Sequence, residues 1–540
     1  MSDLLLPLAI VVPILAATFP LLLGGRYDRI GWPIAAVTAV SLVGMAAWIA
    51  RTVFVVGAPT EYGIVHELGG WQRPYGIELV ADELSAALVV LVALVAAGTL
   101  VLSRVIGPRG NAFYSGYLLL TGGLMGISLT GDLFNLFVFL EIVGLTTYAL
   151  VAADRSGASA YASIKYLLVG TVGASLYLIG VGYTFLATGS LNMIDLQSAI
   201  AAVGYGDPLI RAGYAFIVVG LSLKIAVFPL HVWQPDAYQR APDAVTAFIA
   251  ALVSTSAAYA LLRITYTVFT VEFLAANGAI TNAMLLAAGV SILVGSALAA
   301  MQSDLKRLFA YSSVAQFGMI VAAIALANET ALLGGIVHLL GHGLLKFGLF
   351  LGVALLAYGY GARRVADLAS LARRAPYLSG AVVVLGLALV GIPPSVGLLG
   401  KWYIALGAVE AAGAGDPAGL GIAAVMLVST LFTLAYVARI VEQLYFAGAD
   451  PGPGDAGSST HAADVPTQPN ASTQSDAPAQ SDAPAQPNTS TQPDGGREGH
   501  GDVPTGAFVV LVVVTVTAVG LGFAGFAAYD LFEPFLGRMI

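Results

Sequence analysis

The stretch ETALLGGIVHLLGHGLLKFGLFLGVALLA, residues 329–357, is long and apolar, yet it contains His338, His342 and Lys346. A helix that crosses a bilayer needs about 20 mostly apolar residues, so this stretch can span. Positions i, i+4 and i+8 share one face of a helix, and a rise of about 1.5 Å per residue spreads the three side chains over roughly 12 Å. The stretch predicts a membrane helix with a polar stripe.

The composition extends this prediction to the whole chain. Of 540 residues, 58% are hydrophobic and only 10% are charged, and the mean hydropathy is +0.86. Soluble domains carry about 25% charged residues, so we expect an all-α polytopic membrane protein. Fourteen apolar runs are candidate spans: 3–23, 31–56, 80–102, 112–129, 131–153, 161–188, 209–230, 242–270, 280–301, 304–327, 329–357, 378–413, 420–447 and 506–529. The first run lacks a basic flank and is expected to be a retained helix.

Cysteine and net charge exclude several classes of function. The chain has no cysteine, which rules out disulfides, Cys-ligated zinc, iron–sulfur clusters and thiol nucleophiles. Its formal charge is −8, but residues 448–505 hold eight acidic residues and one arginine, so the remainder is nearly neutral. We therefore expect no nucleic-acid partner.

The arginines predict an orientation, because cytoplasmic loops carry an excess of positive charge. An external N-terminus puts thirteen of the eighteen arginines in or beside cytoplasmic loops, leaving Arg51, Arg73, Arg211, Arg263 and Arg538 on the other side. Fourteen spans then place both termini outside. The polar, repetitive segment 448–505 is predicted to be a disordered cytoplasmic linker, so its two Asn-x-Ser glycosylation triplets are discounted.

Lysines are confined to the predicted spans and their edges. The chain has five: Lys165, Lys224, Lys306, Lys346 and Lys401. A charge inside the membrane costs roughly 2.5–3.5 kcal/mol on insertion scales, so such residues usually line a water-filled path or a proton relay. Lysine can lose its proton when buried, whereas arginine stays charged. This pattern favours proton transfer inside the membrane.

Two sets of these residues suggest specific chemistry. Glu141, ten residues into span 131–153, needs a cationic partner, for which Lys224 is the candidate; the pair is either a switch or a static fastener between helices. His338, His342 and Lys346 predict a proton wire. The alternatives are hydrogen-bonded packing or zinc binding, although no HExxH glutamate or third acidic ligand accompanies the histidines.

Prolines beside two lysines predict interrupted helices. Pro229 follows Lys224, and Pro393 and Pro394 precede Lys401. Proline removes a backbone donor, and the freed carbonyls are tolerated in a membrane only where protein or water satisfies them. Broken helices in corresponding positions point to inverted repeats with an ion path at the breaks. We therefore divide the chain into 1–111 (helices 1–3), 112–270 and 280–447 (the two five-helix repeats, helices 4–8 and 9–13), 448–505 (linker) and 506–540 (helix 14).

Several motifs resemble a known family. They are GDLFNLFVFLE (131–141), HVWQPDAYQRAPDAVTAF (231–248), DLKRLFAYSSVAQ (304–316), the His338/His342/Lys346 face and GIPPSVGLLGK (391–401). Together they resemble the proton-conducting antiporter family, which comprises the D and A subunits of Mrp-type Na+/H+ antiporters and the antiporter-like subunits of respiratory complex I and membrane-bound hydrogenases. Within it, GGW (69–71), PYGI (74–77) and ADELS (81–85) look most like the D subunit.

The resemblance implies roles for individual residues. Glu141 and Lys224 would be the gating ion pair of the first half-channel, and Lys401 the terminal protonatable group of the second. The central hydrophilic axis would consist of Lys306, His338, His342 and Lys346. One departure stands out: where the family usually has a lysine in helix 8, this chain has Thr255. A hydroxyl cannot store a proton, so Ser254, Thr255 and Ser256 are expected to link the halves through water.

We therefore expect the proton-translocating subunit of a multi-subunit Na+/proton antiporter in the cell membrane. It would be an ion transporter and not an enzyme, without cofactor or metal, and its partners would be other subunits, protons, a monovalent cation and lipid. The nearest alternative is a pumping subunit of a complex I-like quinone oxidoreductase or hydrogenase. A solute symporter using the same charges and a non-conducting scaffold, the latter motivated by Thr255, are the other two.

Overall fold

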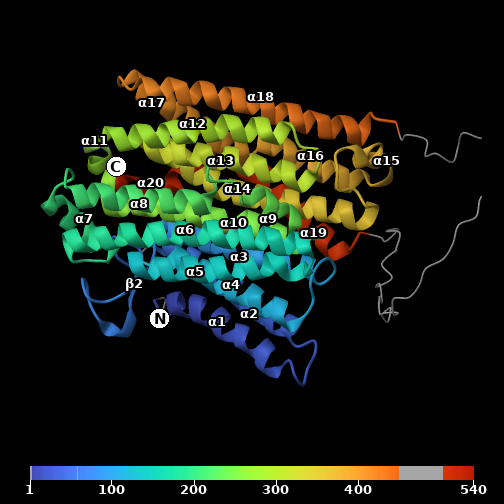
Figure 1. Ribbon diagram of the computed structural model, residues 1–540, viewed down its shortest axis with the longest axis horizontal. Coiled ribbons are helices and arrows are strands. Elements are labelled where there is room, and N and C mark those ends of the chain that lie inside the picture. Colours follow the sequence, from blue (N-terminus) through green and yellow to red (C-terminus); the bar gives the residue numbers. More distant parts are fainter. Residues whose placement is uncertain (1–2, 58, 449–502) are drawn as a thin grey trace, which may run out of the picture.

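The helices of the protein run roughly parallel in one elongated bundle (Figure 1). The computed structural model describes residues 3–57, 59–448 and 503–540; the predicted linker lies almost wholly outside them. The helices are α1 (Leu5–Leu23), α2 (Gly31–Arg51), α3 (Glu83–Ser103), α4 (Asn111–Leu129), α5 (Leu133–Val151), α6 (Gly157–Thr188), α7 (Met193–Val203), α8 (Pro208–Ile225), α9 (Gln234–Arg240), α10 (Asp243–Arg263), α11 (Thr270–Ala276), α12 (Gly278–Ala300), α13 (Leu305–Leu326), α14 (Glu329–Tyr360), α15 (Leu371–Arg374), α16 (Pro376–Val390), α17 (Val396–Gly413), α18 (Pro417–Tyr445), α19 (Thr505–Gly520) and α20 (Gly525–Met539).

The polytopic helical architecture is confirmed. Thirteen helical segments of the described residues are long and apolar enough to cross a membrane. The remaining predicted span, 378–413, is divided between α16 and α17. One local element was not predicted: residues 64–67 and 78–81 form the antiparallel strands β1 (Ile64–Glu67) and β2 (Glu78–Ala81), paired from Ile64 with Ala81 to Glu67 with Glu78. Because β2 takes these residues, α3 starts at Glu83 and not at 80.

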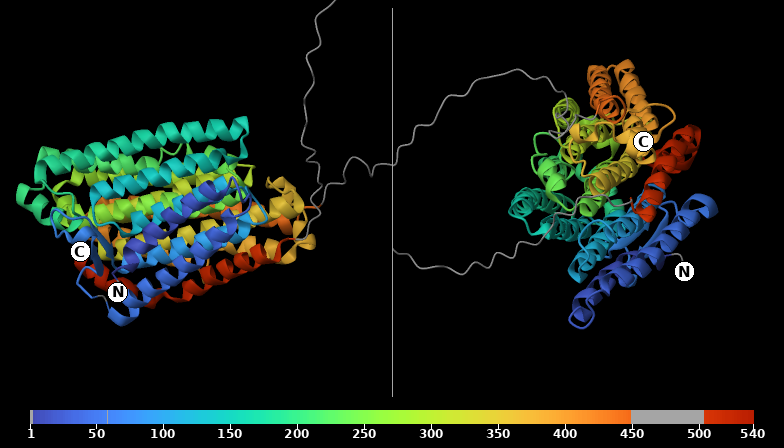
Figure 2. Two further views of the ribbon diagram at one scale, coloured as in Figure 1. Left: turned by 90° about the horizontal axis from the view of Figure 1, so that it is seen from below. Right: turned by 90° about the vertical axis from the view of Figure 1, so that its right-hand side faces the viewer.

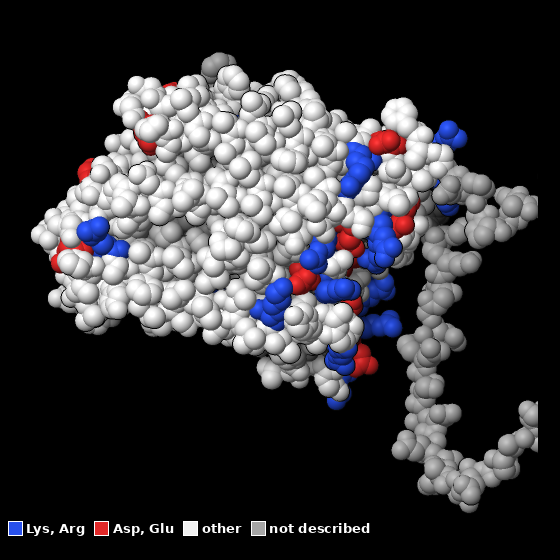
Figure 3. All heavy atoms as spheres, turned by 45° about the horizontal axis from the view of Figure 1, so that its top comes forward, with Lys and Arg blue, Asp and Glu red and all other residues white. Residues whose placement is uncertain are grey.

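The bundle has two ends, which we name by what lies there. Both chain termini lie at one end, here called the termini face, and residues 448 and 503 lie at the other, the linker face (Figures 1 and 2). Lysines and arginines gather at the linker face, and a wide uncharged belt separates the two ends (Figure 3). This belt matches a bilayer core, which excludes unpaired charge.

Burial separates the helices into an interior and a lipid-facing set. The spans containing α10, α13 and α14 are almost wholly buried, whereas α1, α2, α6, α18 and α19 leave large apolar side chains exposed. Exposed Leu and Val on such helices are favourable in lipid, where no water penalises them. Polar side chains on the inner helices must therefore find partners within the bundle.

Two helices are interrupted where the prolines predicted. α8 ends at Ile225 and α9 begins at Gln234, so the first break falls around Pro229; the second, residues 391–395, separates α16 from α17. The inverted-repeat relation of 112–270 to 280–447 stays a prediction.

Candidate functional site

The first polar cluster lies at the break between α8 and α9. Lys224, in the last turn of α8, is 8% exposed, and its Nζ donates a hydrogen bond to Glu141 Oε1 of α5 over 3.1 Å. The same amine lies 3.4 Å from Leu140 O. The structure thus brings the predicted pair into contact, and it places the pair beside a helix end whose carbonyls no longer have helical donors.

The three hydroxyl residues of α10 lie between this pair and α14. Ser254 Oγ donates to Lys224 O at 3.1 Å and accepts from Gln234 Nε2 at 3.3 Å. Thr255 and Ser256 are fully buried. On α14, a Cβ added at Gly343 would lie 3.7 Å from Thr255 Cγ2 and 2.9 Å from Ala251 O, so the two helices touch there. Thr255 therefore lies at the contact of α10 with α14. A link between the two repeats through Ser254, Thr255, Ser256 and water stays a prediction.

Lys346 is wholly buried and belongs to the second cluster. Its Nζ donates to Phe309 O at 2.7 Å and to Ser312 Oγ, both on α13. Its contacts in α13 are neutral oxygens, so the amine is held by hydrogen bonds from a neighbouring helix. A buried amine held in this way can exchange its proton without breaking an ion pair.

The two histidines of α14 follow Lys346 towards the termini face. His338 Nε2 donates to Gln316 Oε1 of α13 at 2.9 Å, and the His338 and His342 rings are 6.1 Å apart, centroid to centroid. His342 contacts the Phe317 ring edge-on at 5.0 Å, but neither of its ring nitrogens has a partner among the described residues. The histidines and Lys346 therefore form the single face that their spacing predicted.

Lys401 lies at the second helix break. Its Nζ donates to Leu389 O at 2.8 Å and Val390 O at 3.1 Å, two carbonyls that the end of α16 leaves without helical donors. α14 and α17 come closest beside it: a Cβ on Gly400 would lie 2.6 Å from His338 Cβ. Only glycine allows this approach, which brings the segment that carries Lys401 against His338.

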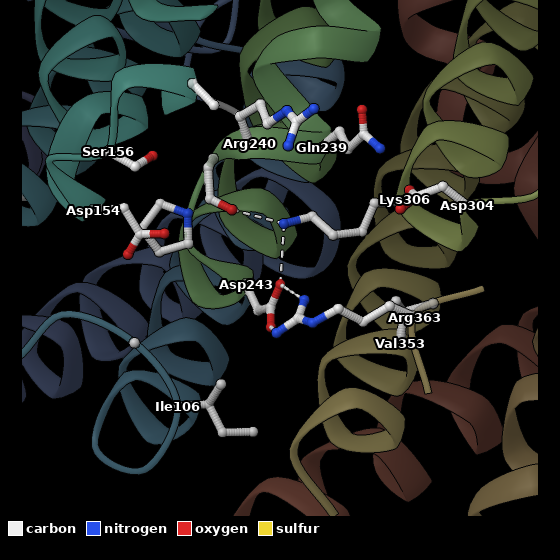
Figure 4. A pocket seen from close by; sticks show the side chains of 14 residues that line it. Ile106, Asp154, Ser156, Gln239, Arg240, Asp243, Asp304, Lys306, Val353 and Arg363 are labelled. Atoms are coloured by element: carbon white, nitrogen blue, oxygen red, sulfur yellow. Dashed lines mark hydrogen bonds and ion pairs between the residues drawn. The ribbon is translucent and has the colours of Figure 1, made fainter. Parts of the chain in front are cut away.

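Lys306 lies apart from the histidines, near the linker face. Its Nζ donates to Ala241 O at 2.7 Å and Asp243 Oδ1 at 3.0 Å, and it lines a cavity open to that face (Figure 4). Along α13, Lys306, Ser312 and Gln316 contact successive partners. Ten residues of helix cover about 15 Å, so α13 carries polar contacts from the cavity to the level of His338.

Several buried polar atoms along this row have no hydrogen-bond partner among the described residues. Most buried polar atoms are paired, because leaving one unpaired costs about 1–3 kcal/mol. The atoms are Thr255 Oγ1, Ser256 Oγ, Gln234 Oε1, His342 Nδ1 and Nε2, His338 Nδ1 and Gln316 Nε2. They lie on both sides of the contact between α10 and α14. We name the whole set, from Glu141 and Lys224 through α10 to Lys346, His342, His338 and Lys401, the polar row.

Sequence reasoning missed four residues that contact the predicted site residues. Gln234 and Asp243 lie in the motif 231–248, and Ser312 and Gln316 lie in the motif 304–316, but none of them was singled out. A signal was available, since an amide or hydroxyl inside an apolar span needs a buried partner. The partner of such a group depends on which helices are neighbours in the fold. The motifs do not contain that information.

The zinc alternative for the histidines finds no support in the ligand geometry. Among residues 3–57, 59–448 and 503–540, no three or more His, Asp or Glu side chains are grouped as metal ligands. A structural zinc site needs four ligands and a catalytic one about three. His338 instead donates to an amide oxygen, which is typical of a hydrogen-bonded histidine.

A different polar cluster closes the termini-face end of α10. Arg263 is 7% exposed and binds Asp82 through both terminal nitrogens, at 2.5 and 2.7 Å. It also donates to Ser85 Oγ at 2.8 Å and to Tyr259 OH, which itself donates to Ser128 O at 2.8 Å. The orientation prediction placed Arg263 among the five arginines on this side of the membrane. Its apolar flanks gave no indication that it is buried and paired within the bundle. We call this the Arg263 cluster.

Fold and polar row together define an integral, multi-pass membrane protein with a polar interior, and comparison with known proteins agrees. Residues 130–432 match the family model described as "NADH:quinone oxidoreductase/Mrp antiporter, TM". Over 456 residues the chain is 41% identical to NADH-quinone oxidoreductase subunit N of Desulforudis audaxviator, covering 83% of this chain and 87% of that one. Over 410 residues it is 31% identical to the D subunit of the Na+/H+ antiporter of Bacillus subtilis, covering 75% and 80%.

Solved structures show the same fold. A chain of the membrane-bound sulfane sulfur reductase, an archaeal respiratory membrane complex, matches with a TM-score of 0.82 at 25% identity, covering 99% of this chain and 97% of that one. A chain of the Mrp complex from Dietzia sp. DQ12-45-1b matches with a TM-score of 0.77 at 24% identity, covering 99% and 98%. The chain therefore belongs to the NADH:quinone oxidoreductase/Mrp antiporter transmembrane family. It is an antiporter-like membrane subunit, as the sequence motifs predicted.

Proposed function

We propose that this chain is the proton-translocating subunit of a multi-subunit antiporter that exchanges Na+ for protons. Protons move along the polar row, and partner subunits complete the cation path. The relative from Bacillus subtilis is named as part of a Na+/H+ antiporter, and both solved neighbours come from multi-subunit membrane complexes. Our proposal extends the Na+/H+ exchange in that relative's name to this chain.

One observation carries the proposal: the polar row crosses both halves of the bundle and contains polar atoms without partners among the described residues. All of its named residues are buried except Glu141, whose side chain is 25% exposed. Such atoms are typically satisfied by internal water, which makes about three hydrogen bonds to buried polar groups. Amines, imidazoles and a carboxylate joined by water form a route along which protons can hop. A row of fully paired groups, as in the Arg263 cluster, would offer no such route.

Each part of the row has a distinct task in this proposal. The Glu141–Lys224 pair loads and releases protons in the first half, and Lys346, His342 and His338 relay them in the second. Lys401 is the terminal group. Since Thr255 cannot store a proton, α10 contributes hydroxyls that orient water between the halves.

A second candidate is a proton-pumping membrane subunit of a complex I-like or hydrogenase-like assembly. The relative with 41% identity is named as a subunit of an NADH-quinone oxidoreductase, and the neighbour with a TM-score of 0.82 belongs to a respiratory complex. The polar row would be the same. Only the source of energy would differ, with electron transfer in the place of a cation gradient.

Cation-dependent collapse of a pH gradient distinguishes the two candidates. In vesicles containing the whole complex, we expect added Na+ to collapse an imposed pH gradient, measured with a pH-sensitive dye, while K+ and Li+ serve as comparisons. The Arg373→Ala variant, changed at an exposed residue of α15, should behave like the parent. If no cation collapses the gradient and quinone reduction builds one, the respiratory assignment replaces the antiporter.

The orientation can be tested because the chain has no cysteine. We propose that the linker face is cytoplasmic and both termini are external, following the arginines at the linker face. Tyr377, at the start of α16, is 81% exposed, and Tyr75, beside β2 on the termini face, is 91% exposed. In intact cells an impermeant thiol reagent should label Tyr75→Cys and spare Tyr377→Cys; the reverse pattern would invert the topology.

A further inference from the structure

A cavity of about 410 Å³ opens on the linker face beside Lys306 (Figure 4). Its polar lining comes from distant parts of the chain: Asp154 and Ser156 before α6, Asp243 at the start of α10, and Arg363 after α14. Each water molecule occupies about 30 Å³ in the liquid, so the cavity has room for several.

The charges around the cavity balance. Three acidic and three basic side chains line it: Asp154, Asp243, Asp304, Arg240, Lys306 and Arg363. An excess of one sign would concentrate ions of the opposite sign in such a space. Because neither sign dominates, the lining favours water and proton exchange over the binding of an anion or a multivalent cation.

One carboxylate joins a buried cation to an exposed one. Asp243 accepts from Lys306 Nζ at 3.0 Å and from Arg363 at 3.3 and 3.4 Å. The exposed fractions of the side chains are 7% for Lys306, 11% for Asp243 and 59% for Arg363. Arg363 can therefore leave towards solvent, whereas Lys306 cannot.

Lys306 lines the cavity and lies on the same helix, α13, as two residues that contact the polar row. Further along the same helix, Ser312 contacts Lys346 and Gln316 contacts His338. A second carboxylate, Asp236, is similarly shared by Lys165 at 2.6 Å and Arg307 at 2.8 Å, but it does not line the cavity. Of the two, only the Asp243 arrangement combines a shared carboxylate with open space.

We propose that this cavity is the mouth for proton uptake and that the Asp243–Arg363 contact is its gate; this rests on the proposed proton-translocating function. When Arg363 leaves, Asp243 accepts an excess proton that bulk solvent delivers through the cavity water, which is left neutral. Lys306 passes an Nζ proton inward through water to the neutral amine of Lys346, and Asp243 then returns Lys306 to its charged form. One proton enters at the cavity for each proton that reaches Lys346, and no charge accumulates at the gate.

Blocking the cavity tests the mouth. Ala158 lines it, is exposed and can be changed to cysteine in a chain that has none. We expect a bulky, impermeant methanethiosulfonate, applied to the linker face of Ala158→Cys vesicles, to slow proton uptake by at least about tenfold. The attached group would separate Asp243 and Lys306 from solvent, and a positioned proton-transfer group contributes about 10²-fold or more. Labelled Tyr377→Cys, on the same face outside the cavity, should retain the parent rate. Failure of Ala158→Cys to be labelled, or labelling without loss, would overturn the proposal.

Removing Arg363 tests the gate. In Arg363→Gln, we expect an imposed pH gradient to decay several-fold faster without added cation, because Asp243 is then free to accept protons; Arg363→Lys should restore the parent leak. An unchanged leak in Arg363→Gln would refute the gate. Uptake is measured with both a Na+ gradient and quinone reduction as the driving force, so failure of the antiporter assignment is distinguished from failure of the mouth.

Discussion

Lys401→Ala is expected to abolish most of the Na+-induced collapse of a pH gradient in vesicles that contain the complete complex. The Lys401 amine donates to both Leu389 O and Val390 O, and its helix packs against His338. Removing the amine removes the proposed terminal proton carrier, so we expect the rate to fall by about 10²-fold, the low end of the range for a positioned proton-transfer group. The dye assay gives the rate directly.

Lys401→Arg separates proton transfer from structure. Arginine keeps the positive charge and can donate to the same two carbonyls, but in proteins it does not give up its proton. We therefore expect Lys401→Arg to assemble normally, as judged by the yield of complex purified through another subunit, and still to fail in exchange. Full exchange by Lys401→Arg would contradict the role of Lys401 as a proton carrier.

Breaking the Glu141–Lys224 pair should stop exchange as well, and the double variant shows why. Either Glu141→Gln or Lys224→Met leaves one buried charge uncompensated, which costs about 3–5 kcal/mol, so assembly is expected to suffer along with transport. Removing both charges relieves that cost. We expect the double variant to recover assembly but not exchange, measured as complex yield and as gradient collapse.

The interpretations of the Glu141–Lys224 pair as a proton switch or as a static fastener predict different exchange rates for the double variant. If Glu141 and Lys224 only fasten α5 to α8, the double variant should regain exchange together with assembly, because a buried ion pair can be replaced by uncharged residues without loss of stability. A regained rate would also favour the non-conducting scaffold for this half of the chain. A persistent loss supports a pair that loads and releases protons.

Local sequence predicted most of the fold, because lipid imposes strong local constraints. Apolar runs predicted most spans to within a few residues, and prolines 229, 393 and 394 located both breaks. The run 506–529 is the exception, since it covers α19 and the start of α20. The hairpin of β1 and β2 was not predicted, since four-residue strands at the membrane surface carry little pattern. Division of the span 378–413 into two helices followed from its prolines.

The candidate site was predictable in its members but not in its contacts. Charged residues in apolar spans are rare enough to be recognised, which is why Glu141, Lys224 and the stripe on α14 were found. Their neutral partners were not found, because Gln316 and Ser312 gain meaning only once α13 lies against α14. The sequence motifs also grouped Lys306 with the histidines, whereas the structure puts it at a cavity near the linker face.

The two ends of α10 lie in different polar surroundings. α10 begins at Asp243, beside the cavity on the linker face. It ends at Arg263, which binds Asp82 through two hydrogen bonds. In the proposed function, protons that travel along the polar row towards the termini face would have to pass this paired cluster or go round it. We therefore expect proton release on that side to require either a rearrangement of the Asp82–Arg263 pair or an outlet supplied by another subunit of the complex.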